Sequence, residues 1–203
     1  MERGQDFFNS RAAEWDQKRV TDKRRLEFLL SLINVPGQGR ILDVGCGTGV
    51  FLEYLLRGKA NDTLAVEAID FSSGLLEIAK AKYEKHTNIN FVCADIRQHE
   101  LQAETYDLIS CLNFFPHLTM LKEKEAYLCK TFRALKAGGE LVIMHDISRA
   151  AVNGIHEHKP ETFNDKLPSA RDTGILLLKA GFSDVVGIED DYLFFVRGKK
   201  TAN

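Results

Sequence analysis

The stretch R-I-L-D-V-G-C-G-T-G, from Arg40 to Gly49, decides the fold. It begins as an apolar, β-branched run that predicts a strand, with the carboxylate of Asp43 near the strand's end. Three glycines at alternate positions, Gly45, Gly47 and Gly49, then predict a tight turn whose backbone can approach a ligand closely. The residues after Gly49 predict a helix, whose first N–H groups have no partner within the helix itself. A strand, a glycine turn and a helix in this order indicate a nucleotide-binding corner.

Bulk composition narrows the class of protein. The chain has 203 residues, is 44% hydrophobic and carries a net charge of −2, which predicts one globular domain over residues 1–203. That charge balance gives no reason to expect nucleic acid or an anionic membrane surface as a partner. The first residues lack the apolar core of a signal peptide, and no apolar run approaches roughly 18 residues. We therefore expect a soluble, cytoplasmic monomer or homodimer.

Strand and helix patterns alternate along the chain. Strands are predicted over 40–44, 64–69, 90–93, 106–112 and 139–145, and helical patterns lie at 48–57, 73–85 and 120–135. Such alternation predicts an α/β fold with a doubly wound, parallel sheet and helices on both faces. A helix over 169–181 and two strands, 183–189 and 192–197, complete the chain.

Two further segments are candidates for covering a ligand. Helical patterns over 6–18 and 22–34 precede the first strand, so residues 1–38 are predicted to form a helical cap. Its aromatic residues Phe7, Phe8 and Trp15 would close over the site or only pack onto the domain. Residues 146–168 show no regular pattern, and a segment of this length predicts an insertion or lid after the fifth strand.

Two more acids follow strand ends. Asp70 ends the second strand in A-I-D-F-S, where an acid can accept hydrogen bonds from both hydroxyls of a ribose. Asp95, in C-A-D-I-R at the end of the third strand, is placed to accept from an adenine amino group.

At this point the sequence resembles the class I S-adenosylmethionine-dependent methyltransferases. The matching blocks, in the family's order and spacing, are D-V-G-C-G-T-G (43–49), A-I-D-F-S (68–72), A-D-I (94–96), Y-D-L-I-S-C-L-N (106–113) and L-K-A-G-G-E-L-V-I (135–143). The resemblance implies a Rossmann-like, mostly parallel seven-stranded sheet whose last strand is antiparallel. It also implies S-adenosylmethionine as the methyl donor and S-adenosylhomocysteine as the product.

The resemblance assigns residues to parts of the cofactor. The turn formed by Gly45, Cys46, Gly47 and Gly49 would lie against the methionine portion, and Asp43 would interact with its amino group, directly or through water. Asp70 would hold the ribose, and Phe71 would lie against the adenine face. The adenine edge would contact Asp95 and Ile96, and the backbone of Leu112 and Asn113 would contact the methionine portion.

Candidate acceptor-side residues are histidines that follow the fourth and fifth strands. Ligands of open parallel sheets bind beyond the carboxyl ends of the strands, where His117 and His145 are predicted to converge. His156 and His158 follow in the irregular segment. One of His117, His145 and His156 would act as a general base on an O, N or S nucleophile. Alternatively, these three would bind a divalent metal together with Asp146 or Asp165. The third possibility is a purely structural role.

The acceptor is predicted to be a small molecule. After the fourth strand the chain reads Asn113-Phe114-Phe115-Pro116, without the double proline found in amino-methyltransferases of DNA and some proteins. Two rival functions stay open. A nicotinamide-dependent dehydrogenase would need the third small residue at Val50, one position after Gly49. A non-catalytic cofactor- or metal-binding protein on the same fold would bind without turnover.

Overall fold

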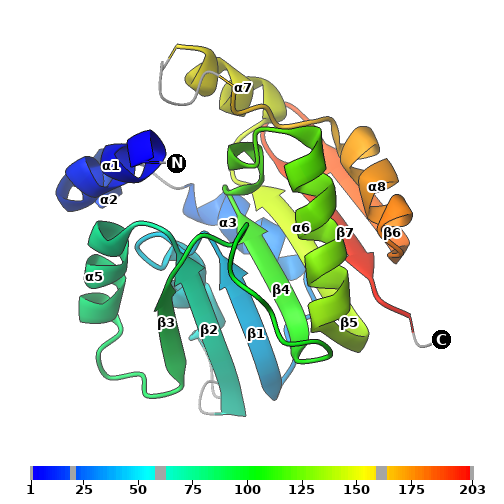
Figure 1. Cartoon of the computed structure of the whole chain (residues 1–203), viewed down its shortest axis with the longest axis horizontal. Coiled ribbons are helices and arrows are strands. Elements are labelled where there is room, and N and C mark those ends of the chain that lie inside the picture. The colour runs from blue at the N-terminus through cyan, green and yellow to red at the C-terminus, as the bar shows by residue number, and fades with distance from the viewer. Residues whose placement is uncertain (1, 19–21, 58–62, 159–163, 202–203) are drawn as a thin grey trace.

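The computed structural model describes residues 2–18, 22–57, 63–158 and 164–201. Seven strands form one sheet in the order β3-β2-β1-β4-β5-β7-β6 (Figure 1). All neighbouring strands from β3 to β5 are parallel, and β7 is antiparallel to both β5 and β6. The predicted α/β fold with an antiparallel last strand is confirmed. The strands are β1 Gly39–Val44, β2 Leu64–Asp70, β3 Ile89–Cys93, β4 Tyr106–Leu112, β5 Leu135–His145, β6 Ser183–Glu189 and β7 Phe194–Lys199.

The position of β1 creates the crevice in which ligands of such sheets bind. From β1 the chain moves outward to β2 and β3, then returns to place β4 on the other side of β1. In register, Ile41 of β1 lies beside Val66 of β2 and Leu108 of β4. The two neighbouring connections therefore leave the carboxyl ends of β1 and β4 in opposite directions. This is a topological switch point, and the glycine corner begins there.

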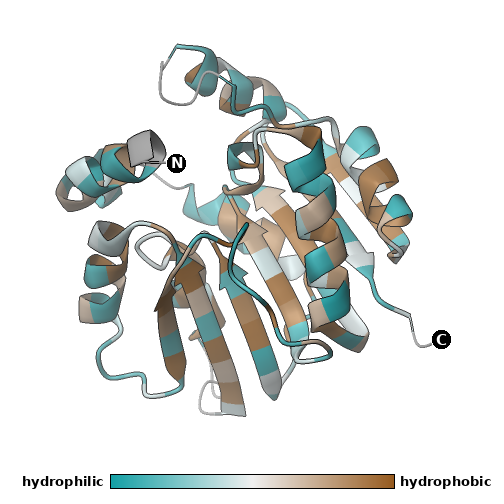
Figure 2. Ribbon diagram, viewed as in Figure 1, coloured by the Kyte–Doolittle hydropathy of each residue, from teal (hydrophilic) through white to brown (hydrophobic). Residues whose placement is uncertain are grey.

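Side-chain alternation along the central strands builds two apolar layers. Leu42 of β1 and Ile109 of β4 belong to a buried cluster that includes residues of α6 and α8. The preceding residues, Ile41 and Leu108, belong to a second cluster with residues of α3 and α4. The central strands are largely apolar in Figure 2, as expected for strands whose two faces are both covered. The helices, with the short 3-10 turns η1 and η3, are α1 Glu2–Arg11, η1 Ala12–Glu14, α2 Trp15–Lys18, α3 Lys23–Ser31, α4 Val50–Leu55, α5 Ser73–Lys82, η3 Phe115–His117, α6 Leu121–Ala134, α7 Arg149–Glu157 and α8 Ala170–Lys179.

The prediction that residues 146–168 lack regular structure was wrong. They contain α7, and Ser148 caps this helix by accepting a hydrogen bond from the Ala151 N–H at 3.2 Å. The helix carries one low-propensity residue, Gly154, in its interior, and it is only nine residues long. Residues 159–163 of the segment lie outside the described residues.

The N-terminal helices differ from prediction only in detail. The expected helix over 6–18 is divided into α1, η1 and α2, while the second expected helix is α3, capped by the Asp22 carboxylate. In Figure 1, α1 and α2 lie above α5, near the upper end of the sheet. No helix in the described ranges is long and apolar enough to cross a membrane.

Leu128 tests the larger apolar layer. Its side chain in α6 is fully buried in the cluster on that face. We expect Leu128→Ala to lower the free energy of unfolding by about 3 kcal/mol, because it removes buried methyl groups and leaves a cavity. Urea denaturation measures the change. Leu121→Ala is the matched control, since Leu121 begins the same helix with 60% of its surface exposed; an equal loss from both variants would contradict this packing.

Candidate functional site

The glycine corner is held against the end of β2 by the backbone. Gly45 N–H and Cys46 N–H both donate to the carbonyl of Ile69, at 2.8 and 3.1 Å. Gly45, Gly47 and Gly49 all have positive φ, of 70°, 54° and 86°. Residues other than glycine adopt a positive φ only at an energetic cost. The turn is therefore a fixed feature of the sheet edge.

Space around the glycines separates protein-facing from open positions. A Cβ on Gly45 would lie 2.7 Å from the Phe114 side chain, and one on Gly49 would lie 2.5 Å from the Tyr83 ring. A Cβ on Gly47 would meet no atom of the described residues within 4 Å. Packing thus requires glycine at the first and third positions, whereas Gly47 borders space that a ligand can enter.

Asp70 fixes the corner through its side chain. One carboxylate oxygen accepts from Gly47 N–H and the other from Ser72 N–H, each at 2.9 Å. Burial raises the pKa of Asp70, and the backbone donors partly oppose that rise. Helix α5 has its own cap in Ser72, so Asp70 is not needed for capping. Since a carboxylate offers about four acceptor positions, two are left for further hydroxyl donors.

Asp43, at the end of β1, contains an unmatched acceptor. Its side chain is 1% exposed, and its Oδ1 accepts from the Ser110 hydroxyl at 2.7 Å. Its Oδ2 is buried without a hydrogen-bond partner among the described residues. Burial raises the pKa of Asp43 to about 7, with a smaller contribution from the nearby charge of Asp70. Such a buried acceptor is rare in folded proteins and fits a cationic donor supplied by a ligand.

The predicted adenine-side residues lie along the next two strand ends. Phe71 is half-buried, and its ring centroid lies 5.5 Å from that of Phe8 in α1. Ile96 is buried, whereas the Asp95 carboxylate binds the Arg97 guanidinium through contacts of 2.7 to 3.0 Å. An acceptor role toward adenine would therefore share Asp95 with Arg97. The sequence pattern did not indicate this pairing.

Asn113 connects the ends of β4 and β5. It has a left-handed backbone with φ of 59°, which is uncommon outside glycine. Its side-chain N–H donates to the Asp146 carboxylate at 3.0 Å, and its backbone N–H donates to Met144. Its Oδ1 is a second buried acceptor without a partner in the described structure. Strained backbone of this kind is frequent at ligand sites. Leu112, just before it, is buried.

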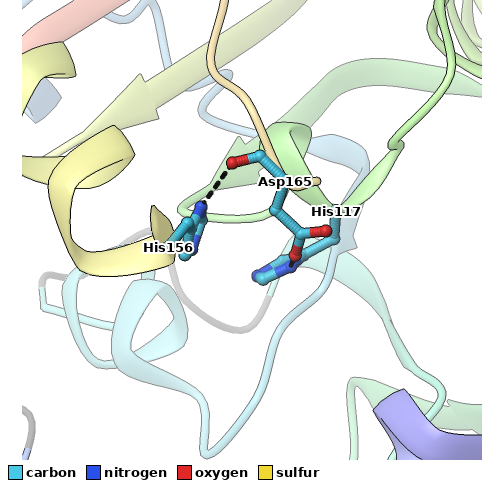
Figure 3. A group of neighbouring side chains, drawn as sticks. All are labelled: His117, His156 and Asp165. Atoms are coloured by element: carbon cyan, nitrogen blue, oxygen red, sulfur yellow. Dashed lines mark hydrogen bonds and ion pairs between the residues drawn. The ribbon is translucent and has the colours of Figure 1, made fainter. Parts of the chain in front are cut away.

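The three candidate histidines lie in two separate parts of the structure. His117, in η3, and His156, in α7, lie together with Asp165 (Figure 3), and one ligand-type atom from each lies within 4.8 Å of the others. His145 is absent from this group. It is 2% exposed, and its ring contacts that of Phe194 edge-on at 5.9 Å. The structure therefore groups His117 and His156 with Asp165, in place of the expected convergence with His145.

One aromatic ring connects the corner to the histidines. The Phe8 ring centroid lies 5.5 Å from Phe71 and 5.5 Å from His117, with Trp15 at 5.2 Å. Polar contacts hold the same N-terminal segment: the Thr48 hydroxyl donates to Asp16 at 2.6 Å. Of this segment only the aromatic residues were candidates from the sequence.

More polar contacts from α1 and α2 reach the corner. Gln5 donates to the Phe71 carbonyl at 2.6 Å, Asn9 accepts from Ser72 at 2.7 Å, and Asp16 also pairs with Lys82. All of these contacts join positions far apart in the chain, and no local pattern marks them. The N-terminal helices are thus fastened to the corner at several points.

A parallel sheet with its glycine corner at the switch point defines a Rossmann-like nucleotide-binding fold. Residues 41–139 match the family described as methyltransferase domain. Fold, corner and the match over residues 41–139 together support a class I S-adenosylmethionine-dependent methyltransferase, in agreement with the resemblance seen in the sequence.

The chain is similar both to an O-methyltransferase and to an N-methyltransferase. The ubiquinone biosynthesis O-methyltransferase of Coxiella burnetii is 29% identical over 138 residues, covering 68% of this chain and 55% of that protein. Among solved structures, phosphoethanolamine N-methyltransferase 2 of Haemonchus contortus, in complex with phosphomonomethylethanolamine and S-adenosylhomocysteine, has a TM-score of 0.75 at 14% identity. The alignment covers 97% of this chain and 58% of the Haemonchus contortus chain. This chain spans about half the length of these relatives.

A third comparison matches in size as well. A methyltransferase from Aquifex aeolicus, described as S-adenosylmethionine-dependent, has a TM-score of 0.70 at 23% identity. The alignment covers 95% of this chain and 98% of that chain. At this identity the likeness is one of fold.

Alanine substitutions at Gly45 and Gly47 test whether the first glycine is packed against protein while the second borders open space. We expect Gly45→Ala to lower the melting temperature by several degrees more than Gly47→Ala, because only the first adds a clash with Phe114 to the strain of positive φ. Differential scanning fluorimetry of both variants without ligand measures the difference. Equal melting temperatures would show that Phe114 yields to a methyl group.

Proposed function

We propose that the protein transfers the methyl group of S-adenosylmethionine to an O, N or S atom of a small molecule. The observation that carries the proposal is the unmatched Asp43 Oδ2 at a switch-point glycine corner, within residues that match a methyltransferase domain. Charge supports the choice of acceptor class, because a net charge of −2 offers no basic platform for nucleic acid. A cytoplasmic location and a monomeric or homodimeric state belong to the proposal.

The donor side is assigned from the fit of the corner. When bound, S-adenosylmethionine supplies an activated methyl group on a sulfonium. The ammonium of its methionine portion would meet Asp43 Oδ2, and charge would match charge in a buried position. Asp70 would accept from the ribose hydroxyls while still holding Gly47 N–H. Gly47 would allow the backbone to approach the ligand, because nothing in the described part of the chain lies within 4 Å of the position of a Cβ there.

Phe8 would close the space between donor and acceptor. Its ring lies between Phe71, on the expected adenine side, and His117. An aromatic ring there would exclude water and favour a sulfonium through cation–π attraction. Methyl transfer is an in-line displacement, so holding both partners in position supplies much of the acceleration.

His117 is the candidate group for the acceptor. Its Nδ1 is 2.5 Å from the Asp165 carboxylate, which fixes the ring orientation. The buried Lys124 ammonium is one of the charges close to that carboxylate. A ring held in this way would have its second nitrogen available to accept a proton from the nucleophile. His145, packed against Phe194, would support β5 and β7 instead.

Cofactor binding separates this function from its rivals. We expect micromolar binding of S-adenosylhomocysteine by calorimetry, at least about 100-fold weaker in Asp70→Asn, because charge-assisted hydrogen bonds to the ribose are lost. Asp184→Asn is the control, since Asp184 is an exposed acid on the outer strand β6. Tighter binding of NAD than of S-adenosylhomocysteine would instead favour a dehydrogenase. Cofactor binding without turnover of any acceptor would favour a binding protein.

The raised pKa of Asp43 predicts a pH dependence. Ionised Asp43 should bind the ligand ammonium better, so the affinity for S-adenosylhomocysteine should rise about tenfold between pH 5.5 and 7.5 as Asp43 loses its proton with a pKa of about 7. Calorimetry at several pH values measures this, and Asp43→Asn should show no such rise.

The folding stability of the ligand-free chain should depend on pH in the opposite direction and fall as the pH rises. Its folded state keeps a proton on Asp43 that the unfolded chain releases near the ordinary pKa of 3.8. Stability from this proton is therefore present below that value and is lost as the pH rises toward 7. If the affinity of the unsubstituted protein for S-adenosylhomocysteine did not depend on pH, the proposed contact between Asp43 and the ligand ammonium would be contradicted.

A further inference from the structure

Asp165 holds two histidines from different elements at once. Its carboxylate Oδ2 lies 2.5 Å from His117 Nδ1, and its backbone carbonyl lies 2.8 Å from His156 Nδ1. The two ring centroids are 5.4 Å apart, and Figure 3 shows both rings beside the same aspartate. Asp165 is 6% exposed, whereas both rings are only half-buried. A buried residue thus positions two solvent-accessible imidazoles.

The hydrogen bonds determine which ring nitrogens carry lone pairs. A carbonyl oxygen only accepts, so His156 Nδ1 must carry the proton, and the lone pair of the neutral ring is on Nε2. An ionised carboxylate has the same effect on His117. Imidazoles that bind metals commonly donate their other N–H to a carboxylate or a backbone carbonyl, which fixes the ring and raises its basicity. Asp165 supplies one partner of each kind.

Distances within the group are close to those of a metal site. One ligand-type atom from each of His117, His156 and Asp165 lies within 4.8 Å of the other two. Ligands arranged tetrahedrally at about 2.1 Å from an ion lie roughly 3.4 Å apart, so modest side-chain rotations would close the site. No other group of this type with three or more members occurs in the described parts of the chain.

We propose that His117 and His156, positioned by Asp165, bind a divalent first-row transition-metal ion, for which zinc is the probe. Imidazole nitrogen with carboxylate oxygen suits zinc, iron(II) and nickel. Two or three protein ligands leave coordination positions open, as in sites that bind substrate.

The role of the ion rests on the proposed methyl transfer, although its binding does not. The Phe8 ring lies 5.5 Å from the ring of His117, so the ion would sit on the acceptor side of the cofactor corner. With the ion bound, His117 would serve as its ligand and would no longer accept the proton. The ion would instead hold the acceptor's hydroxyl or thiol and lower its pKa, so that the proton leaves to solvent before the oxygen or sulfur attacks the methyl group. The metal ion itself undergoes no redox change.

Zinc binding by the full chain, free of any affinity tag, tests the site. Competition with a chromophoric chelator should show one zinc per chain, bound at least about 100-fold more weakly by His117→Ala and by His156→Ala. His158→Ala is the matched control, because His158 is exposed at the end of the same helix α7 and belongs to no such group. It should bind zinc like the unsubstituted protein.

Three results would overturn the metal site. They are absence of stoichiometric binding, equal loss in His158→Ala, and undiminished binding in both alanine variants. S-adenosylhomocysteine calorimetry on each variant checks folding and separates the two proposals. Cofactor binding without zinc binding overturns the metal site alone, whereas zinc binding without cofactor binding overturns the methyl-transfer function alone.

Discussion

The site depends on one bridging contact, the Asp70 carboxylate between the Gly47 and Ser72 N–H groups. It joins the turn after β1 to the start of α5, so two elements that meet at the switch point become one rigid edge. The cost of burying this carboxylate is offset by backbone donors that the turn would otherwise leave unpaired. The positive φ values of the glycines persist because this contact and the Ile69 carbonyl hold the turn on both sides.

Much of the fold was predictable because its signals are local. Alternating strands and helices, and the glycine turn after Val44, depend on neighbouring residues, and they specified the sheet and its ligand edge. Residues 149–157 show the limit of that approach. Their helix begins at a serine cap and has only nine residues, with Gly154 within it. A helix this short, with a glycine in its interior, depends on its cap and on packing, which the local residues do not specify.

The acceptor side was only partly predictable, since it is made by contacts between distant positions. His117 and His156 were identified by their place after strand ends, but the residue that brings them together is Asp165, 48 positions after the first of them. His145 has the same signal and lies elsewhere, packed against Phe194. Alternation along β5 does not distinguish a terminal residue that faces a ligand from one that packs against a neighbouring strand.

The position of the Phe8 ring would couple the binding of the donor to the binding of the acceptor. One ring, on a helix fastened by a few side-chain hydrogen bonds, contacts both the donor-side Phe71 and the acceptor-side His117. A ligand that orders this helix on either side prepares the surface met by the other ligand. Donor and acceptor would then strengthen each other's binding by the same factor, whichever binds first. A single aromatic ring can in this way make a donor site and an acceptor site depend on each other.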